Sequence, residues 1–162
     1  MTRPATANDA IDAIEAIRQS ITILCEADHH NDAATLDRWL ANKKPDSFKT
    51  WIADPDNYCV VEEAGGRVQG VGLLRRSGEL QLFYVAPGHE RRGIGRKIHE
   101  ALMSQAKHWG LTKVHLESTS VARCFYESLG YRYTGAEKFF RGLQVFPYEK
   151  TLDIAARDID AR

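Results

Sequence analysis

A glycine- and arginine-rich segment, RRGIGRK at residues 91–97, has the residue types of an anion-binding site. It follows a predicted strand and opens a predicted helix, so unpaired N–H groups and the positive end of the helix dipole meet there. Gly93 and Gly95 lack a Cβ and let an anion approach the backbone. Charge-assisted contacts to a diphosphate can come from Arg91, Arg92 and Arg96. The spacing matches neither a P-loop nor a dinucleotide-binding fingerprint, so it predicts a phosphate site of another kind or a tight turn with a solvated basic face.

The sequence around residues 91–97 changes hydrophobic period in a way that predicts alternating strands and helices. Apolar residues at alternate positions, separated by glycine turns, favour an antiparallel meander of strands at 58–64, 67–76 and 79–86. Apolar residues three and four positions apart, followed by Gly110, favour a helix from Ile94 to Trp109. The other predicted elements are an extended opening at 3–6, helices at 9–25, 36–40 and 48–52, a strand at 113–118, a helix capped by Ser118 or Thr119 that ends at Leu129, and strands at 131–140 and 143–152.

The composition excludes several classes of function. Twenty-two Lys and Arg balance 22 Asp and Glu, so no net field attracts nucleic acid or an anionic membrane. No stretch approaches the roughly 20 apolar residues of a membrane span, and no secretory signal is recognisable, so we expect a cytoplasmic protein. The three cysteines show no paired spacing and are expected to be reduced and structural. His29 and His30 are adjacent and cannot easily share one ion, so we expect no metal site.

Two motifs in a fixed order resemble those of the GNAT acetyltransferase superfamily. The first, YVAPGHERRGIG, matches the family pattern at Val85, Pro87, Gly93 and Gly95. The second, TSVARCFYESLGY, matches it at Ala122, Phe125, Tyr126, Gly130 and Tyr131. The resemblance implies a mixed α/β (α+β) fold, with a central, mostly antiparallel sheet of six to seven strands flanked by helices and splayed between the fourth and fifth strands. The length of 162 residues with 43% apolar residues favours a single domain, at 1–152, and leaves a charged tail at 153–162.

The resemblance also implies that acetyl-CoA is the co-substrate. The diphosphate would lie on the loop and helix start formed by Arg91, Arg92, Gly93, Ile94, Gly95 and Arg96, and the pantetheine would pair with strand residues Phe83, Tyr84 and Val85. Glu90 stands where the family usually has Gln or Arg. Thr119 stands where Asn is common, so the contact that family members make there to the pantetheine arm is either absent or made by a hydroxyl.

Acid–base chemistry points to two further residues. Neutralising an aliphatic ammonium near pH 7 costs about 4.6 kcal/mol, so a general base is useful, and Glu117 is favoured over Glu79, His29 and His30. Tyr126 can protonate the thiolate that leaves and is predicted to be the general acid. Cys124, two residues away on the same helix, is expected to point to a different side, so we expect direct attack by the amine rather than an acyl-enzyme.

The sequence therefore predicts an N-acetyltransferase that acts on a primary amine of a small molecule or peptide. A catalytically silent acyl-CoA-binding sensor or interaction module is the alternative. The acidic residues of the first connecting region, Glu26, Asp28, Asp32 and Asp37, hint at a cationic acceptor or form a solvated loop. A homodimer formed through the last strands or the tail is possible.

Overall fold

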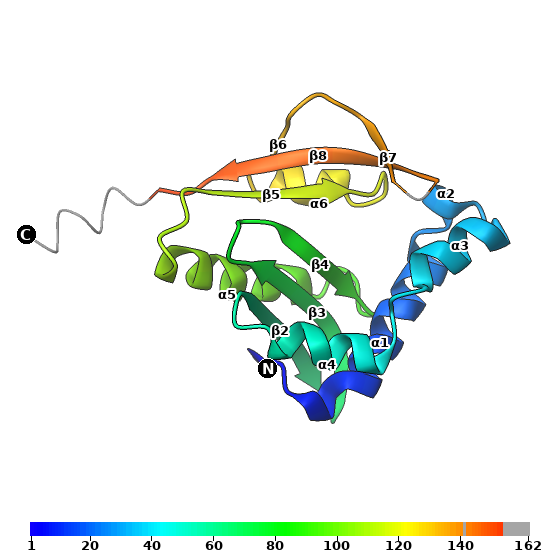
Figure 1. The fold of residues 1–162 in the computed structure, drawn as a ribbon, viewed down its shortest axis with the longest axis horizontal. Helices are drawn as coiled ribbons and strands as arrows, with labels where there is room; N and C mark the ends of the chain where they lie inside the picture. The colour runs from blue at the N-terminus through cyan, green and yellow to red at the C-terminus, as the bar shows by residue number, and fades with distance from the viewer. Residues whose placement is uncertain (141, 154–162) are drawn as a thin grey trace, which may run out of the picture.

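Two groups of strands form the centre of the computed structural model, which describes residues 1–140 and 142–153 (Figure 1). In the first sheet the antiparallel neighbours are, in order, β1 (Thr2–Pro4), β2 (Asn57–Ala64), β3 (Arg67–Arg75) and β4 (Leu80–Val85). In the second, β8 (Leu143–Thr151) pairs antiparallel with β5 (Lys113–Ser118), β6 (Arg132–Tyr133) and β7 (Lys138–Phe140). The architecture is the mixed, mostly antiparallel one that the sequence predicts.

The two sheets meet where β4 and β5 begin. A parallel bridge joins Glu79 to His115, and beyond it the two strands separate. Figure 1 shows them diverging toward the end of the molecule that carries α2 (Glu26–His29) and α3 (Ala33–Leu40). The opening between β4 and β5 therefore leaves one edge of β4 without a partner strand in the described part of the chain.

Helices cover both faces of the first sheet. The apolar sides of α1 (Ala10–Gln19) and α4 (Pro45–Ala53) pack on one face in a core with β2, β3 and β4. The other face receives α5 (Ile94–His108), through Ile98 and Leu102. This helix lies very close to β3, because a Cβ added at Gly72 would fall 2.5 Å from Ile98 Cγ2. The same core continues under the second sheet and includes α6 (Arg123–Ser128).

The predicted helix at 9–25 is divided into shorter elements. After the 3-10 turn η1 (Ala7–Asp9) and α1, the chain forms a π-helix, η2 (Ser20–Leu24), and then α2. The Nε2 of buried His29 lies 3.0 Å from the carbonyl oxygen of Ile21 and 3.2 Å from that of Thr22, while its Nδ1 accepts the N–H of Asn31. The ring of His29 thus contacts two carbonyl groups of η2, one of which, that of Ile21, also accepts the N–H of Cys25 at 3.3 Å.

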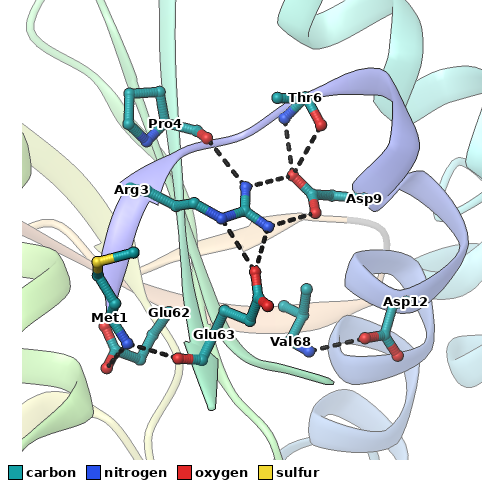
Figure 2. Close-up of polar contacts among 9 residues, drawn as sticks. All are labelled: Met1, Arg3, Pro4, Thr6, Asp9, Asp12, Glu62, Glu63 and Val68. Carbon is teal, nitrogen blue, oxygen red and sulfur yellow. Dashed lines mark hydrogen bonds and ion pairs between the residues drawn. The ribbon is translucent and has the colours of Figure 1, made fainter. Parts of the chain in front are cut away.

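The first strand is held in place by an ion-pair network (Figure 2). Arg3 donates to both carboxylate oxygens of Asp9, at 2.9 and 2.8 Å, and its Nε donates to Glu63 at 3.0 Å. Hydrogen bonds from Arg3 lower the pKa of Asp9. One helical turn further on, Asp12 accepts the backbone N–H of Val68 at 2.7 Å. These contacts fix β1 and α1 against β2 and β3.

One predicted strand is interrupted. Residues 131–140 form β6 and β7 with a turn between them, in which Gly135 has φ +96°. The structure consequently has more strands than the six to seven expected. The predicted tail lies, beyond Asp153, outside the described residues.

Candidate active site

A cavity of about 710 Å³ lies where β4 and β5 separate. Its walls come from η2, β4, the loop between β4 and α5, β5 and α6. It is lined by every site residue predicted above except Arg92 and Ile94, namely by Phe83, Tyr84, Val85, Arg91, Gly93, Gly95, Arg96, Glu117, Thr119 and Tyr126. Residues far apart in the sequence are thus brought to one site. The side chain of Ile94 is buried in the core instead, and Arg92 is exposed.

The free edge of β4 faces this cavity. Ala86 donates its N–H to Gln69 of the β3 side at 2.8 Å, and hydrogen-bonded pairs alternate along an antiparallel ladder. Tyr84, opposite Val71, therefore also bonds toward β3. The N–H and C=O groups of Phe83 and Val85 point the other way, toward the cavity. Of the three strand residues predicted to pair with a ligand through their backbone, only these two therefore present free polar groups to it.

The amino terminus of α5 forms the second wall. Lys97 is the first residue whose N–H bonds back, to Gly93 at 3.1 Å. Among the described residues, the N–H groups of Ile94, Gly95 and Arg96 have no backbone acceptor. Gly93 precedes the helix with φ +79°, a left-handed conformation that strains other residues. This end of the cavity has the donors and charge of a diphosphate site.

Gly95 has a different role from the one that its type suggested. A Cβ at this position would lie 2.9 Å from Phe125 Cζ, so the missing side chain makes room for an aromatic ring of α6. The Phe125 ring in turn packs 5.5 Å from Phe83 and 5.6 Å from Tyr126, centroid to centroid. Gly95 therefore sets how closely the start of α5 approaches Tyr126.

Tyr126 is held by the way α6 ends. Gly130, at φ +91°, donates its N–H to Glu127, and Tyr131 donates its N–H back to Tyr126, the pattern of a Schellman motif. This turn returns the Tyr131 ring to 5.6 Å from the Tyr126 ring. The Tyr131 hydroxyl lies 2.9 Å from Nε2 of buried His99 on α5. The two helices that border the cavity are thus tied together behind Tyr126.

Burial controls the protonation of the groups in the cavity. It raises the pKa of Tyr126 well above that of an ordinary phenol, so the side chain keeps its proton at neutral pH. It also raises the pKa of the Cys25 thiol to about 12, so this cysteine is not a thiolate nucleophile.

The candidate bases differ in their positions. Glu117 is half-exposed, lines the cavity and forms an ion pair with Lys138 at 3.6 Å. Glu79 pairs with Arg75 at 3.6 Å and lines a neighbouring groove rather than the cavity. His29 is fully occupied by the contacts that stabilise η2. His30 caps α2 in a left-handed conformation and does not line the cavity.

One expectation about α6 is wrong. The helix begins at Arg123, and the hydroxyl of Ser118 donates to the carbonyl oxygen of Thr119 at 2.7 Å, so neither residue caps it. Cys124, expected to point to a different side from Tyr126, is exposed where Tyr126 is buried, and it borders the cavity as well.

Some lining residues were not anticipated. They are Ser20, Leu24 and Cys25 of the η2 region and Val121 of the loop before α6. A continuous helical pattern over 9–25 gives no sign of the π turn that directs the first three into the cavity.

Within residues 1–140 and 142–153, no helix is long and apolar enough to cross a membrane. In this described part of the chain, no three His, Cys, Asp or Glu side chains gather in a way that could hold a metal ion.

Comparison with known proteins agrees with this geometry. A family model for an acetyltransferase (GNAT) domain matches residues 25–152. The chain is similar to 5-NmdU N-acetyltransferase of Pseudomonas phage PaMx11, 30% identical over 104 residues that are 61% of this chain and 74% of that protein. It is also similar to the uncharacterized N-acetyltransferase YjgM of Escherichia coli (strain K12), 32% identical over 85 residues that are 47% of this chain and 51% of that one.

Solved structures show the same fold. A GCN5-related N-acetyltransferase from Rhodopseudomonas palustris superposes with a TM-score of 0.83 at 20% identity, over 94% of this chain and 95% of that one. PaiA N-acetyltransferase from Thermoplasma acidophilum, solved in complex with coenzyme A, superposes with a TM-score of 0.82 at 18% identity, over 94% of this chain and 98% of that one. Since the family model covers more than half of the sequence, this chain belongs to the GNAT family and is an acyltransferase.

Proposed function

We propose that the protein transfers an acetyl group from acetyl-CoA to a primary amine by direct attack. The observation that carries this proposal is the single cavity into which α5, the free edge of β4 and Tyr126 converge. The name of the phage relative, an N-acetyltransferase, supports an amine nitrogen as the acceptor.

The residues present fit acetyl-CoA. The N–H groups at the start of α5, with Arg91 and Arg96 beside them, suit a diphosphate. The backbone groups of Phe83 and Val85 suit the amides of a pantetheine arm and can polarise a carbonyl oxygen. Acetyl-CoA, when bound, supplies a thioester carbonyl to which the amine nitrogen bonds as the carbon–sulfur bond breaks.

Tyr126 is the proposed general acid. Its phenol keeps a proton at the cavity wall and donates it to the sulfur that leaves. Burial makes the phenol a weaker acid, but it also makes a thiolate a stronger base, as the raised pKa of Cys25 in the same cavity indicates. The proton transfer is therefore less uphill than the phenol pKa alone would imply.

Glu117 is the proposed base. Its carboxylate lies on β5, across the opening from β4, and half of it is open to solvent, so it can take a proton from an incoming ammonium directly or through water. The ion pair with Lys138 is exposed at both ends and is weak enough to be exchanged for a substrate ammonium.

Turnover by purified protein tests the proposal. Acetyl-CoA is mixed with phenethylamine and other primary amines, released CoA is measured with a thiol reagent, and the acetylated product is identified by its mass. We expect Tyr126→Phe to lower kcat by about 100-fold or more. Tyr133→Phe, a matched change outside the cavity, should stay within about twofold of wild type. Unchanged kcat in Tyr126→Phe would remove Tyr126 from the mechanism, and acetyl-CoA binding without turnover of any amine would favour a silent sensor.

A further inference from the structure

The cavity has a second end, on the opposite side of β4 from α5. Phe83 and Val85 pack with the α5 core, whereas Tyr84 packs with the α1 core, so the opening between β4 and β5 connects the two faces of the sheet. Ser20, Leu24 and Cys25 line this second end, and Val121 adds a wall from the loop before α6. If the start of α5 holds the diphosphate, an acceptor approaches from the η2 side.

The acidic residues near η2 do not line this end. Asp32 caps α3 by accepting the N–H of Thr35 at 2.9 Å. Asp28 accepts the N–H of Ser120 at 2.7 Å and so fixes α2 to the loop before α6. Glu26 accepts from the side chain of Asn31 at 2.9 Å. Three residues of the acidic run that hinted at a cationic acceptor, Glu26, Asp28 and Asp32, therefore make contacts within local structure.

The described lining holds two carboxylates at different places. Glu90 belongs to the loop before α5 and lies in sequence beside Arg91, at the diphosphate end. Glu117 is the carboxylate that remains for the acceptor. Apart from the hydroxyl of Ser20, the other residues assigned to the second end are apolar or neutral: Leu24, Val121 and the protonated thiol of Cys25.

One carboxylate among apolar side chains can match one ammonium and an apolar body. A second or third ammonium would have to lose its water against Leu24 and Val121 without a partner, which is costly. We propose that the acceptor is a small monoamine with an apolar or aromatic body, selected over polyamines and aminoglycosides by Leu24 and Val121. This inference rests on the acetyltransferase activity proposed above and names its substrate class.

A panel of amines tests the class. With acetyl-CoA saturating, kcat/KM is measured for phenethylamine and isopentylamine as apolar monoamines, for spermidine as a polyamine, and for kanamycin as an aminoglycoside. We expect the better monoamine to exceed both polycations at least tenfold. A polycation that equals or exceeds the monoamines overturns the inference but leaves the acetyltransferase activity intact. Acetyl-CoA binding with no amine turned over overturns the proposed function and this inference with it.

Variants locate the selectivity. Leu24→Glu places a second carboxylate at this end and should lower kcat/KM for phenethylamine at least tenfold while raising it for spermidine. Ile23→Glu is the matched control, since Ile23 is the preceding residue of η2, is 57% exposed and does not line the cavity. It should leave both values within twofold.

Val121→Glu, in a loop and 46% exposed, repeats the test where a change to the fold is less of a concern. It should shift selectivity in the same direction as Leu24→Glu. If both lining variants behave like Ile23→Glu, the apolar end does not select the acceptor and the inference is wrong.

Discussion

Replacing Gly95 by alanine should disturb the proposed acid more than the diphosphate site. The added Cβ would lie 2.9 Å from Phe125 Cζ and 3.2 Å from Phe125 Cε2, which is too close for an undisturbed ring. The ring is confined on its other sides by Phe83 and Tyr126. A displacement of Phe125 is therefore passed on to the Tyr126 hydroxyl.

The size of the effect follows from the packing. Forcing an extra carbon into a filled core costs roughly 1–3 kcal/mol. At about 2–4 °C per kcal/mol for a domain of this length, the melting temperature should fall by roughly 2–12 °C. Because a small misplacement of a catalytic group slows the chemical step, kcat should fall by about tenfold or more, with less change in KM for acetyl-CoA.

Gly93→Ala provides the contrast. Apart from its two chain neighbours, the described residues place no atom within 4 Å of a Cβ at Gly93, but its φ of +79° imposes strain of roughly 1–2 kcal/mol on alanine. This change acts on the loop that presents the N–H groups, so KM for acetyl-CoA should rise more than kcat falls. Melting curves and steady-state kinetics of both variants check the prediction. Wild-type kcat and melting temperature in Gly95→Ala would refute the packing argument, and so would the same kinetic pattern in the two variants.

Three further predictions concern groups around the cavity. Burial, with the positive charges of Lys150 and Arg96, lowers the pKa of His99 from 6.5 to about 4, so the unfolded chain takes up this proton first as the pH falls. The contribution of neutral His99 to the free energy of unfolding is therefore complete above about pH 6.5 and falls as the pH is lowered. Denaturant titrations should show a loss of about 2 kcal/mol between pH 7 and 5 in the wild-type protein, and no such loss from this site in His99→Gln. Tyr131→Phe should cost about 1–3 kcal/mol of unfolding free energy, because Nε2 of His99 loses its partner, and wild-type stability would contradict this. Cys124→Ala should retain kcat within about twofold. Complete loss of turnover in this variant would point to an acyl-enzyme instead.

The parts of the site that the sequence predicts depend on local patterns. Alternation identifies β4, and a glycine before a helical period identifies the start of α5, because backbone conformation and hydrophobic period leave a direct trace in residue types. The Schellman end of α6 is likewise visible as Gly130 followed by an aromatic residue. These features bring the proposed acid, the backbone donors and the open strand together, and the glycine and aromatic positions among them also belong to the motifs of the family resemblance.

The parts that the sequence did not predict depend on contacts distant along the chain. The π turn in η2 is stabilised by His29, the last residue of the following helix α2. Asp28 accepts the N–H of Ser120, which lies far along the chain. The space around Gly95 is defined by a ring thirty residues later in the chain. Residue type alone could not separate these structural roles from catalytic ones. The domain limits, a homodimer and a cytoplasmic location stay predictions.

A crystal structure of the protein with CoA tests the central claim most directly. We expect the diphosphate within hydrogen-bonding distance of the N–H groups from Gly93 to Arg96, the pantetheine along Phe83 and Val85, and the sulfur beside the Tyr126 hydroxyl. A diphosphate bound away from the start of α5, or a sulfur out of reach of Tyr126, would contradict it.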